Sequence, residues 1–293
     1  MSDERKRGAV ILLISAVAFS QLNVFVRMVG ALPVMEIIFF RNLLGALGAW
    51  LIVRQQKQSL HCAKKDLPLL SARCILGFLA MYCSFYAAAN AAQADVSTLT
   101  KMAPFITIGL AAVVLKEKIT VYQVVAMVLA FSGMLIVVGK LSFDSKTFPL
   151  LMAVMCAVIS AVVNIVLRKL GGRVSPAAVV FYFSLVSALC ALPIMLPSFV
   201  MPTFKQALLL LAIGACAVLG QITLTAGMGM VPAGEGSLYN LAGIPASAIL
   251  AWILLGEALK LRTIVGGLLI VAASVSVFMG IRSSTKITDK KLK

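Results

Sequence analysis

Ten apolar stretches, each close to the length of a membrane-spanning helix, dominate the sequence and limit what it can fold into. A helix needs about 20 apolar residues to cross the hydrocarbon core of a bilayer. Such stretches lie at residues 8–28, 33–53, 67–89, 94–115, 120–139, 147–168, 176–196, 203–228, 234–255 and 262–281. Only 12% of the residues are charged, against about a quarter in soluble domains. The chain is therefore predicted to be a polytopic membrane protein.

These stretches are predicted to be helices. Hydrocarbon offers the backbone no hydrogen-bond partner, so a spanning segment must be a helix or a strand of a closed barrel. The stretches are too long and too continuously apolar for the alternating strands of a barrel. The first one follows a basic start, as in a signal peptide, but nine more follow and no convincing cleavage site does. We therefore expect an all-α membrane protein with ten transmembrane helices, the first of which is retained.

The net charge of +16 is distributed in a way that predicts orientation, because cytoplasmic loops carry an excess of Lys and Arg. With the N-terminus inside, 17 of the 26 Lys and Arg fall in inner segments and 6 in outer ones, and Arg41, Arg73 and Lys101 lie within spans. Both termini are therefore predicted to be cytoplasmic, in a bacterial inner membrane. Nucleic-acid binding needs a basic face on a soluble domain and is not expected.

The chain also repeats itself. NVFVRMVG at 23–30 matches NIVLRKLG at 164–171, and LAAVVLKEKI at 110–119 matches LAWILLGEAL at 250–259, while ADVSTL at 94–99 parallels GEGSLY at 234–239. The offsets are 141, 140 and 140 residues. Each unit holds five spans, an odd number, so the second unit is predicted to enter the membrane inverted. The predicted division is a five-helix repeat at 1–140, an inverted repeat at 141–281 and a basic cytoplasmic tail at 282–293.

This organisation resembles a known family. The stretches ADxSxLxKxxPF before LKEKI and AGEGSLYN before LLGEAL, with ten spans in two repeats, are similar to the EamA-type branch of the drug/metabolite transporter superfamily. The short E-x-x-F-F-R stretch, Glu36 to Arg41, also resembles a subgroup that includes bacterial S-adenosylmethionine uptake carriers. The resemblance implies a secondary carrier with a central cavity between the two halves. It leaves open the substrate and the direction of transport.

Charged residues inside spans are the first candidates for a substrate site, because such residues usually face protein or water. Glu36 and Arg41 are about 140° apart around a helix, so each must contact other helices. Their depths overlap with that of Lys101. We predict a water-filled cavity lined by Arg41 and Lys101, with Glu36 as a neutralising or proton-accepting partner. The alternative is an architectural Glu36–Lys101 bridge. Two cations and one carboxylate favour a substrate with at least one carboxylate, such as an amino acid or small organic acid.

Other polar residues complete the candidate set. Hydrogen bonding or stacking with substrate is expected from Asn23, Tyr86, Asn164, Tyr182, Tyr239 and Asn240, although the asparagines could instead join helices. Asp95 and Glu235 lie at equivalent helix ends, as N-terminal caps or as gates. Glu117 and Glu257 lie at membrane edges beside loops and are expected to make anchoring or loop contacts. Pro104 and Pro245 are predicted to kink the fourth and ninth spans.

The sequence gives no support for an enzyme. It holds one histidine, His61, in a basic loop, and it lacks the HExxH, GxSxG and P-loop patterns. The six cysteines are scattered without metal-ligand spacing, so neither a metal nor a cofactor is expected. A channel or a lipid scramblase is the alternative to a carrier. The expected partners are a small-molecule substrate and the lipid bilayer, and the sequence leaves the oligomeric state open.

Overall fold

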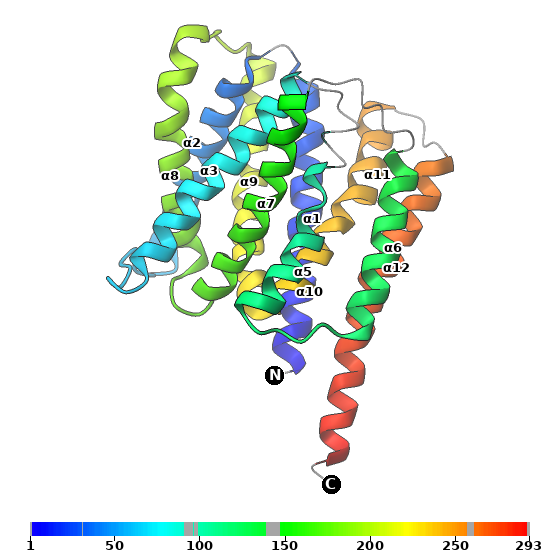
Figure 1. Cartoon of the computed structure of the whole chain (residues 1–293). Helices are drawn as coiled ribbons and strands as arrows, with labels where there is room; N and C mark the ends of the chain where they lie inside the picture. The colour runs from blue at the N-terminus through cyan, green and yellow to red at the C-terminus, as the bar shows by residue number, and fades with distance from the viewer. Residues whose placement is uncertain are drawn as a thin grey trace.

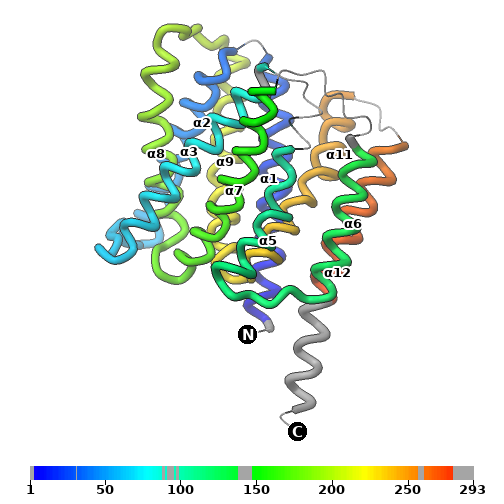
Figure 2. Tube along the Cα trace, viewed as in Figure 1, coloured from blue at the N-terminus to red at the C-terminus, as the bar shows by residue number. Residues whose placement is uncertain are grey.

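The computed structural model is built from helices, which run between two ends of the molecule (Figure 1). It describes residues 2–30, 32–90, 96, 99–138, 147–256 and 261–291, with the helix alone described for 280–291. Figure 2 follows the trace of the chain from the N-terminus to the C-terminus. Both chain termini lie at the same end, called here the terminal end, and the opposite end is called the distal end. No strand occurs among the described residues. The predicted all-α membrane fold is confirmed.

The helices follow the predicted apolar stretches closely. Their bounds are α1 (Ser2–Val29), α2 (Val34–Gln55), α3 (Leu67–Asn90), α5 (Ala103–Val114), α6 (Val121–Val138), α7 (Thr147–Leu170), α8 (Pro176–Met195), α9 (Phe204–Met230), α10 (Ala233–Tyr239), α11 (Gly243–Leu255) and α12 (Leu261–Lys291), with short 3₁₀ turns η1 (Leu196–Ser198) and η2 (Asn240–Ala242). Eight segments are long and apolar enough to cross a membrane, and α5 and most of α6 are shorter apolar helices. These segments account for the ten predicted spans.

The fourth and ninth spans are not continuous helices. Lys101 and Met102 form a turn directly before α5, and η2 separates α10 from α11. Pro104 and Pro245 each follow the interruption by two or three residues, near the start of α5 and α11. Proline lacks an amide hydrogen and clashes with a preceding helical turn, so it is tolerated at the start of a helix and breaks its interior. The sequence predicted kinks here, and the structure has a short turn or 3₁₀ turn at each place while the flanking backbone stays in the right-handed helical region.

The helix pairing is unchanged when each helix is replaced by its counterpart in the other repeat. The most extensive pairs are α1 with α9, α3 with α7, α2 with α8, and α6 with α12. Exchanging the first and sixth spans, and the third and eighth, turns the α1–α9 pair into the α7–α3 pair. The other two pairs map onto themselves. In Figure 1, α6 and α12 stand together at one side, and α2, α3 and α8 at the other.

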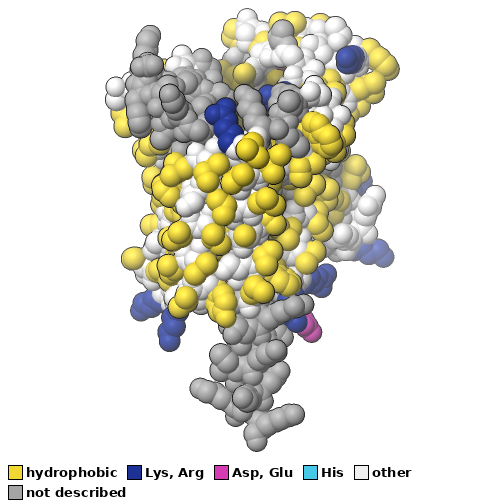
Figure 3. Space-filling view, turned by 90° about the vertical axis from the view of Figure 1, so that its right-hand side faces the viewer, with side chains coloured by type: hydrophobic (Ala, Val, Ile, Leu, Met, Phe, Trp, Pro, Cys, Tyr) yellow, Lys and Arg dark blue, Asp and Glu magenta, His cyan; other side chains and the backbone are white. Residues whose placement is uncertain are grey.

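The outer surface has the character of a lipid-facing one. On the face shown in Figure 3, apolar side chains cover the middle of the molecule, and the visible Lys and Arg side chains lie toward its two ends. Large apolar side chains such as Val113, Ile253 and Leu268 are 79%, 63% and 65% exposed. A soluble monomer rarely exposes a continuous apolar surface of this extent. The chain is thus a multi-pass membrane protein in its architecture.

Candidate functional site

A cavity of about 350 Å³ lies in the middle of the helix bundle. Helices α1, α2, α3, α7, α8 and α9 contribute to its wall, and we call it the central cavity. Its polar or charged lining residues are Asn23, Arg41, Arg73, Ser84, Ser160, Asn164 and Gln221, and its apolar ones include Met81, Phe85, Val163, Phe183 and Leu224. Both repeats therefore face this cavity, as the sequence predicted for a substrate site.

Arg41 enters the central cavity from the middle of α2. One of its terminal nitrogens, Nη1, lies 3.7 Å from the sulfur of Met81 on α3. Its Nε atom is buried and has no hydrogen-bond partner among the described residues. No ion pair joins Arg41 to a described carboxylate. The guanidinium therefore retains donors for a ligand.

Arg73 is a second arginine of the central cavity, and sequence reasoning missed it as a site residue. It is 3% exposed. Its Nη2 donates to Oε1 of Gln221 on α9 at 3.0 Å, and its guanidinium lies 4.0 Å from the ring centroid of Phe183 on α8. Its Nε has no partner among the described residues. The sequence feature that could have identified Arg73 as a site residue is its position within a predicted span, which it shares with Arg41 and Lys101.

Lys101 lines a neighbouring cavity of about 240 Å³. This second cavity, called the lysine cavity, shares Asn23 and Leu224 with the central cavity. Lys101 is half-buried at the interruption of the fourth span and makes no hydrogen bond or ion pair with the described residues. Asn240 lines the same cavity, with its Oδ1 buried and unbonded. The structure thus places Lys101 next to the central cavity rather than in the same wall as Arg41.

The two adjacent cavities carry an unbalanced positive charge. Arg41, Arg73 and Lys101 contribute three cations, and no Asp or Glu of the described chain lines either cavity. A neutral amide and an aromatic ring compensate Arg73 in part. Removing charged groups from water without a partner is unfavourable, especially inside a membrane protein. The site is therefore suited to an anion.

Glu36 lies elsewhere than predicted. It is fully buried near the start of α2, and its Oε2 accepts a hydrogen bond from the backbone N–H of Val200 at 3.1 Å. Its Oε1 has no partner among the described residues. Glu36 lines neither cavity and makes no bridge to Lys101. Its hydrogen bond joins α2 to the segment before α9. The prediction was wrong because the depth of a residue in the membrane does not reveal which neighbouring segment its side chain contacts.

The remaining predicted polar residues divide into two groups. Asn23 and Asn164 line the central cavity, and Asn164 Nδ2 also donates to Thr107 Oγ1 at 3.2 Å. The three tyrosines lie outside both cavities. Tyr86 packs its ring on Phe148, and Tyr182 donates to the carbonyl of Leu60. Tyr239 is buried in α10, and its hydroxyl has no hydrogen-bond partner among the described residues.

A polar network holds the terminal end together and includes two of the predicted carboxylates. Glu117, expected to make anchoring or loop contacts, accepts hydrogen bonds from the N–H groups of Ala233 and Gly234 at 3.1 and 3.5 Å. It therefore caps α10, and it also lies 3.7 Å from Arg168. Glu235 does not cap α10 but pairs with Arg5 of α1 at 2.6 Å, and its role as a gate stays a prediction.

Two further predicted residues, Asp95 and Glu257, lie outside the described residues. The network nevertheless joins both repeats, since Glu117 follows α5 and its partners belong to α7 and α10. Arg168 also donates to the carbonyl of Gly229 at the end of α9. The structure thus closes the terminal end with contacts between the repeats.

Comparison with known proteins places these features in context. The model of the EamA-like transporter family matches twice, at residues 6–139 and 147–279. The pseudopaline exporter CntI of Pseudomonas aeruginosa, strain UCBPP-PA14, is 34% identical over 94% of this chain and 96% of its own length. An S-adenosylmethionine uptake transporter of Rickettsia bellii is 25% identical over 96% of this chain and 95% of its own. A protein of known crystal structure shares the fold with a TM-score of 0.85 at 18% identity, over 95% of this chain and 98% of its own.

Proposed function

The chain belongs to the EamA-like transporter family, and we propose that it exports a small metabolite with two or more carboxylates across the bacterial inner membrane by alternating access. The family and its relatives are transporters and not enzymes. The observation that carries the proposal is the set of three cations around two adjacent cavities without a described acidic neighbour.

The types of cation support a carboxylate ligand. A guanidinium binds a carboxylate through two parallel hydrogen bonds and stays charged when partly buried. Arg41 and Arg73 both line the central cavity and both retain an unbonded Nε. Lys101 adds a third positive charge in the adjacent lysine cavity. A ligand with two or more carboxylates along its length would therefore neutralise more of the positive charge than a ligand with a single carboxylate. An amino acid derivative or a small organic acid has this chemistry.

The opposite repeat supplies an apolar counterpart. FFRNLLGAL at 39–47 aligns with FYFSLVSAL at 181–189, at an offset of 142, so that Phe183 stands where the first repeat has Arg41. Leu241 stands at the position equivalent to Lys101, at an offset of 140, and lines the lysine cavity. At these two positions the first repeat thus provides charge and the second provides carbon surface. We propose that the ligand presents its carboxylates to the first repeat and its carbon skeleton to the second.

Alternating access between inverted repeats is the proposed mechanism. The helix pairing that survives exchange of the repeats supports it, because two similar units can then adopt two mirrored arrangements around one central site. The interrupted fourth and ninth spans pack against each other through α5 and α10. They offer places where the helices can bend.

Export is proposed because the exporter relative is the more similar of the two named relatives, at 34% against 25% identity. The test is uptake of a radiolabelled metabolite into inside-out vesicles, after a thermal-shift screen of the purified protein against a metabolite library. A ligand that binds only the folded state raises stability by mass action. We expect polycarboxylate hits and saturable uptake that an unlabelled hit inhibits. Hits made only of cations would overturn the substrate class, and non-saturable flux would indicate a channel.

Arg41 allows a direct test of the site. Arg41→Lys should reduce transport strongly with near-normal expression, and Arg41→Gln should abolish it. Arg54→Gln is the matched control, since Arg54 lies at the end of the same helix over the Trp50 ring, 5.0 Å from its centroid. Near-wild-type transport by Arg41→Gln of every hit would show that the arginine is architectural.

The proposed orientation has both termini in the cytoplasm. A cysteine placed after Lys293 should then react with an impermeant thiol reagent in inside-out vesicles and stay unreactive in intact cells with a permeabilised outer membrane. The opposite pattern would reverse the orientation.

A further inference from the structure

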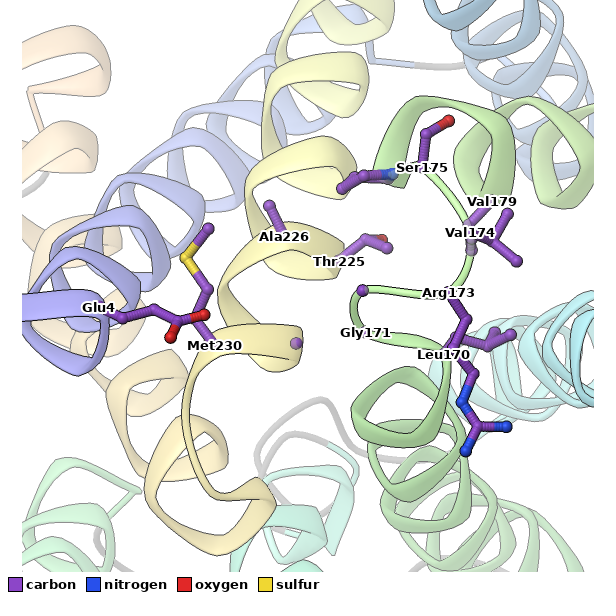
Figure 4. Close-up of a pocket in the computed structure, with 13 residues that line it drawn as sticks. Glu4, Leu170, Gly171, Arg173, Val174, Ser175, Val179, Thr225, Ala226 and Met230 are labelled. Atoms are coloured by element: carbon purple, nitrogen blue, oxygen red, sulfur yellow. The ribbon is translucent and has the colours of Figure 1, made fainter. Parts of the chain in front are cut away.

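A third cavity lies at the terminal end of the molecule, apart from the central and lysine cavities. It has a volume of about 450 Å³ and lies between the start of α1, the α7–α8 turn and the last turns of α9. Figure 4 shows Thr225 of α9 projecting toward the turn that carries Gly171 and Arg173, while the side chain of Met230 reaches toward Glu4 of α1. We call this cavity the vestibule.

The vestibule is separated from the central cavity by a thin layer of protein. On α8, Phe183 lines the central cavity and Val179, one turn away, lines the vestibule. On α9, Gln221 and Thr225 are related in the same way. One helical turn advances about 5.4 Å, which is the scale of a side-chain barrier. The two cavities therefore lie in series along the same helices.

Repeat exchange relates the helices of the vestibule to four of the six helices that line the central cavity. These four are α1, α2, α3 and α7, and α3 contributes Ser84 and Phe85 from its last third. Exchanging the repeats converts them into α7, α8, α9 and α1. These four helices and the α7–α8 turn line the vestibule. At an offset of 140, Thr225 in the vestibule is the counterpart of Phe85.

Two features of the vestibule suit an anion, while Glu4 on its α1 side is an acidic member of the lining and Arg173 is paired with Asp66. Thr225 is 5% exposed, and its hydroxyl has no hydrogen-bond partner among the described residues. In Figure 4 it projects from α9 toward the α7–α8 turn. Helix α8 begins at this cavity with Ser175 as its N-cap and Pro176 as its first residue. A helix N-terminus carries a partial positive charge and favours anions.

The vestibule is held in a narrow form by close backbone contact. A Cβ atom added to Gly229 would lie 2.9 Å from the Cα of Gly171, so the ends of α7 and α9 touch. Arg168 strengthens this contact by donating to the carbonyl of Gly229. Widening the vestibule therefore requires the α7–α8 turn to separate from α9.

From these observations we propose that the vestibule is the closed inner mouth of the transport pathway and a loading site for the carboxylate substrate. The proposal rests on the proposed function, because it takes the same anionic ligand and the same two-state motion. When the repeats exchange arrangements, the α7–α8 turn moves away from α9, and the vestibule joins the central cavity. The hydroxyl of Thr225 and the start of α8 then meet the ligand before the arginines do.

The test uses thiol chemistry and needs no transported ligand. Ala226→Cys, in inside-out vesicles, is treated with an anionic and with a cationic impermeant methanethiosulfonate. Wild-type protein gives the background, because none of its six cysteines lines the vestibule. Ala215→Cys is the matched control, since Ala215 lies on the same helix and is exposed on the outer surface.

We expect Ala226→Cys to react from the inner face, and the anionic reagent to be favoured several-fold over the cationic one after each rate is divided by its rate on a free thiol. No reaction above background, or a preference for the cationic reagent, would overturn the loading site. Because the readout is modification, it separates this proposal from a failure of carboxylate transport.

A second pair of variants tests the pathway itself. Ala226→Phe fills the vestibule, and it should keep the thermal shift caused by a hit from the screen while losing uptake into inside-out vesicles. Ala215→Phe adds the same bulk at the outer surface and should transport normally. Wild-type uptake by Ala226→Phe would overturn the proposal. If Ala226→Phe does not fold, Thr225→Val takes its place as the test of the loading site. We expect Thr225→Val to raise KM several-fold and to leave the thermal shift unchanged. An unchanged KM would overturn the loading site.

Discussion

Glu117 is predicted to hold the inner end closed, and neutralising it should open the vestibule. Its carboxylate accepts from the N–H groups of Ala233 and Gly234 and lies 3.7 Å from Arg168. Glu117 belongs to the first repeat and all three partners to the second. Glu117→Gln keeps the size of the side chain, but it removes the charge and one acceptor oxygen. The change therefore weakens a link between the repeats without creating a cavity.

The magnitude follows from the contacts. A hydrogen bond to a charged group contributes roughly 1.5–3 kcal/mol, and the glutamine oxygen can keep one of the two. The Arg168 pair is partly exposed, with side chains 32% and 20% accessible, so screening reduces it to about 1 kcal/mol or less. The bond that is given up is the long one to Gly234, at 3.5 Å, which is weaker than a bond of ordinary length and contributes about 1 kcal/mol. With the screened ion pair we therefore expect a loss of about 1–2 kcal/mol from the closed form, which corresponds to a factor of roughly 5–30 in its equilibrium.

The assay is the rate at which Ala226→Cys is modified in inside-out vesicles. Adding Glu117→Gln should raise this rate about 5–30-fold, in line with that shift. Asp3→Asn is the matched control, because Asp3 is a carboxylate at the same end whose side chain is 97% exposed and pairs only with Lys6 among the described residues. A double-mutant cycle with Arg168→Gln should be non-additive, since the two side chains share one contact.

Two results would show that Glu117 does not keep the terminal end closed. If Glu117→Gln changes neither the modification rate of Ala226→Cys nor the melting temperature, Glu117 does not stabilise the closed form. If the melting temperature falls and the modification rate is unchanged, the carboxylate stabilises α10 but does not keep the repeats together. If the effects of Glu117→Gln and Arg168→Gln on the modification rate are additive, the ion pair between the two side chains does not contribute to closing the terminal end.

Three further predictions test the site and its surroundings. Arg73→Gln should weaken binding of a screened carboxylate 10-fold or more by thermal shift, while Arg54→Gln leaves it unchanged, and equal affinities would exclude Arg73 from the site. Glu36→Gln should lower the melting temperature through the weakened bond to Val200 and leave KM and the pH profile of transport unchanged; a flattened profile would restore Glu36 as a proton site. Gly171→Ala, whose new Cβ would meet Gly229, should speed modification of Ala226→Cys, and Gly109→Ala, which has open space around it, should not.

The positions of the helices could be predicted well because the bilayer sets their length. The seventh span was predicted at 176–196 and α8 covers Pro176–Met195. Interruptions were harder to predict, since an apolar stretch does not reveal where the backbone hydrogen bonds of a helix fail. The fourth and ninth stretches appeared continuous, and only Pro104 and Pro245 indicated bending. The described part of the structure shows a turn before each.

The candidate site could be predicted only in part. Charge within a span identified Arg41 and Lys101, and the same signal was available for Arg73, which no motif accompanied. Glu36 was assigned to the cavity by its depth in the membrane. Depth follows from counting residues, whereas the neighbour that a side chain meets depends on rotation about the helix axis and on tertiary packing. Glu36 and Arg41 are about 140° apart on α2, and they meet different helices.

The two regions that match the family model pair their helices in a corresponding way but place different side chains at equivalent positions. In the proposed mechanism this difference separates motion from recognition. Arg41, Arg73 and Lys101 all come from the first repeat, while exchange of the repeats preserves the helix pairing. The same cations therefore face the centre whichever end is open, so the central charge alone favours neither direction. A difference between loading and release must come from the two mouths. Phe85 on the distal side and Thr225 in the vestibule are equivalent positions with different chemistry, and we infer that such pairs set which side the substrate enters from.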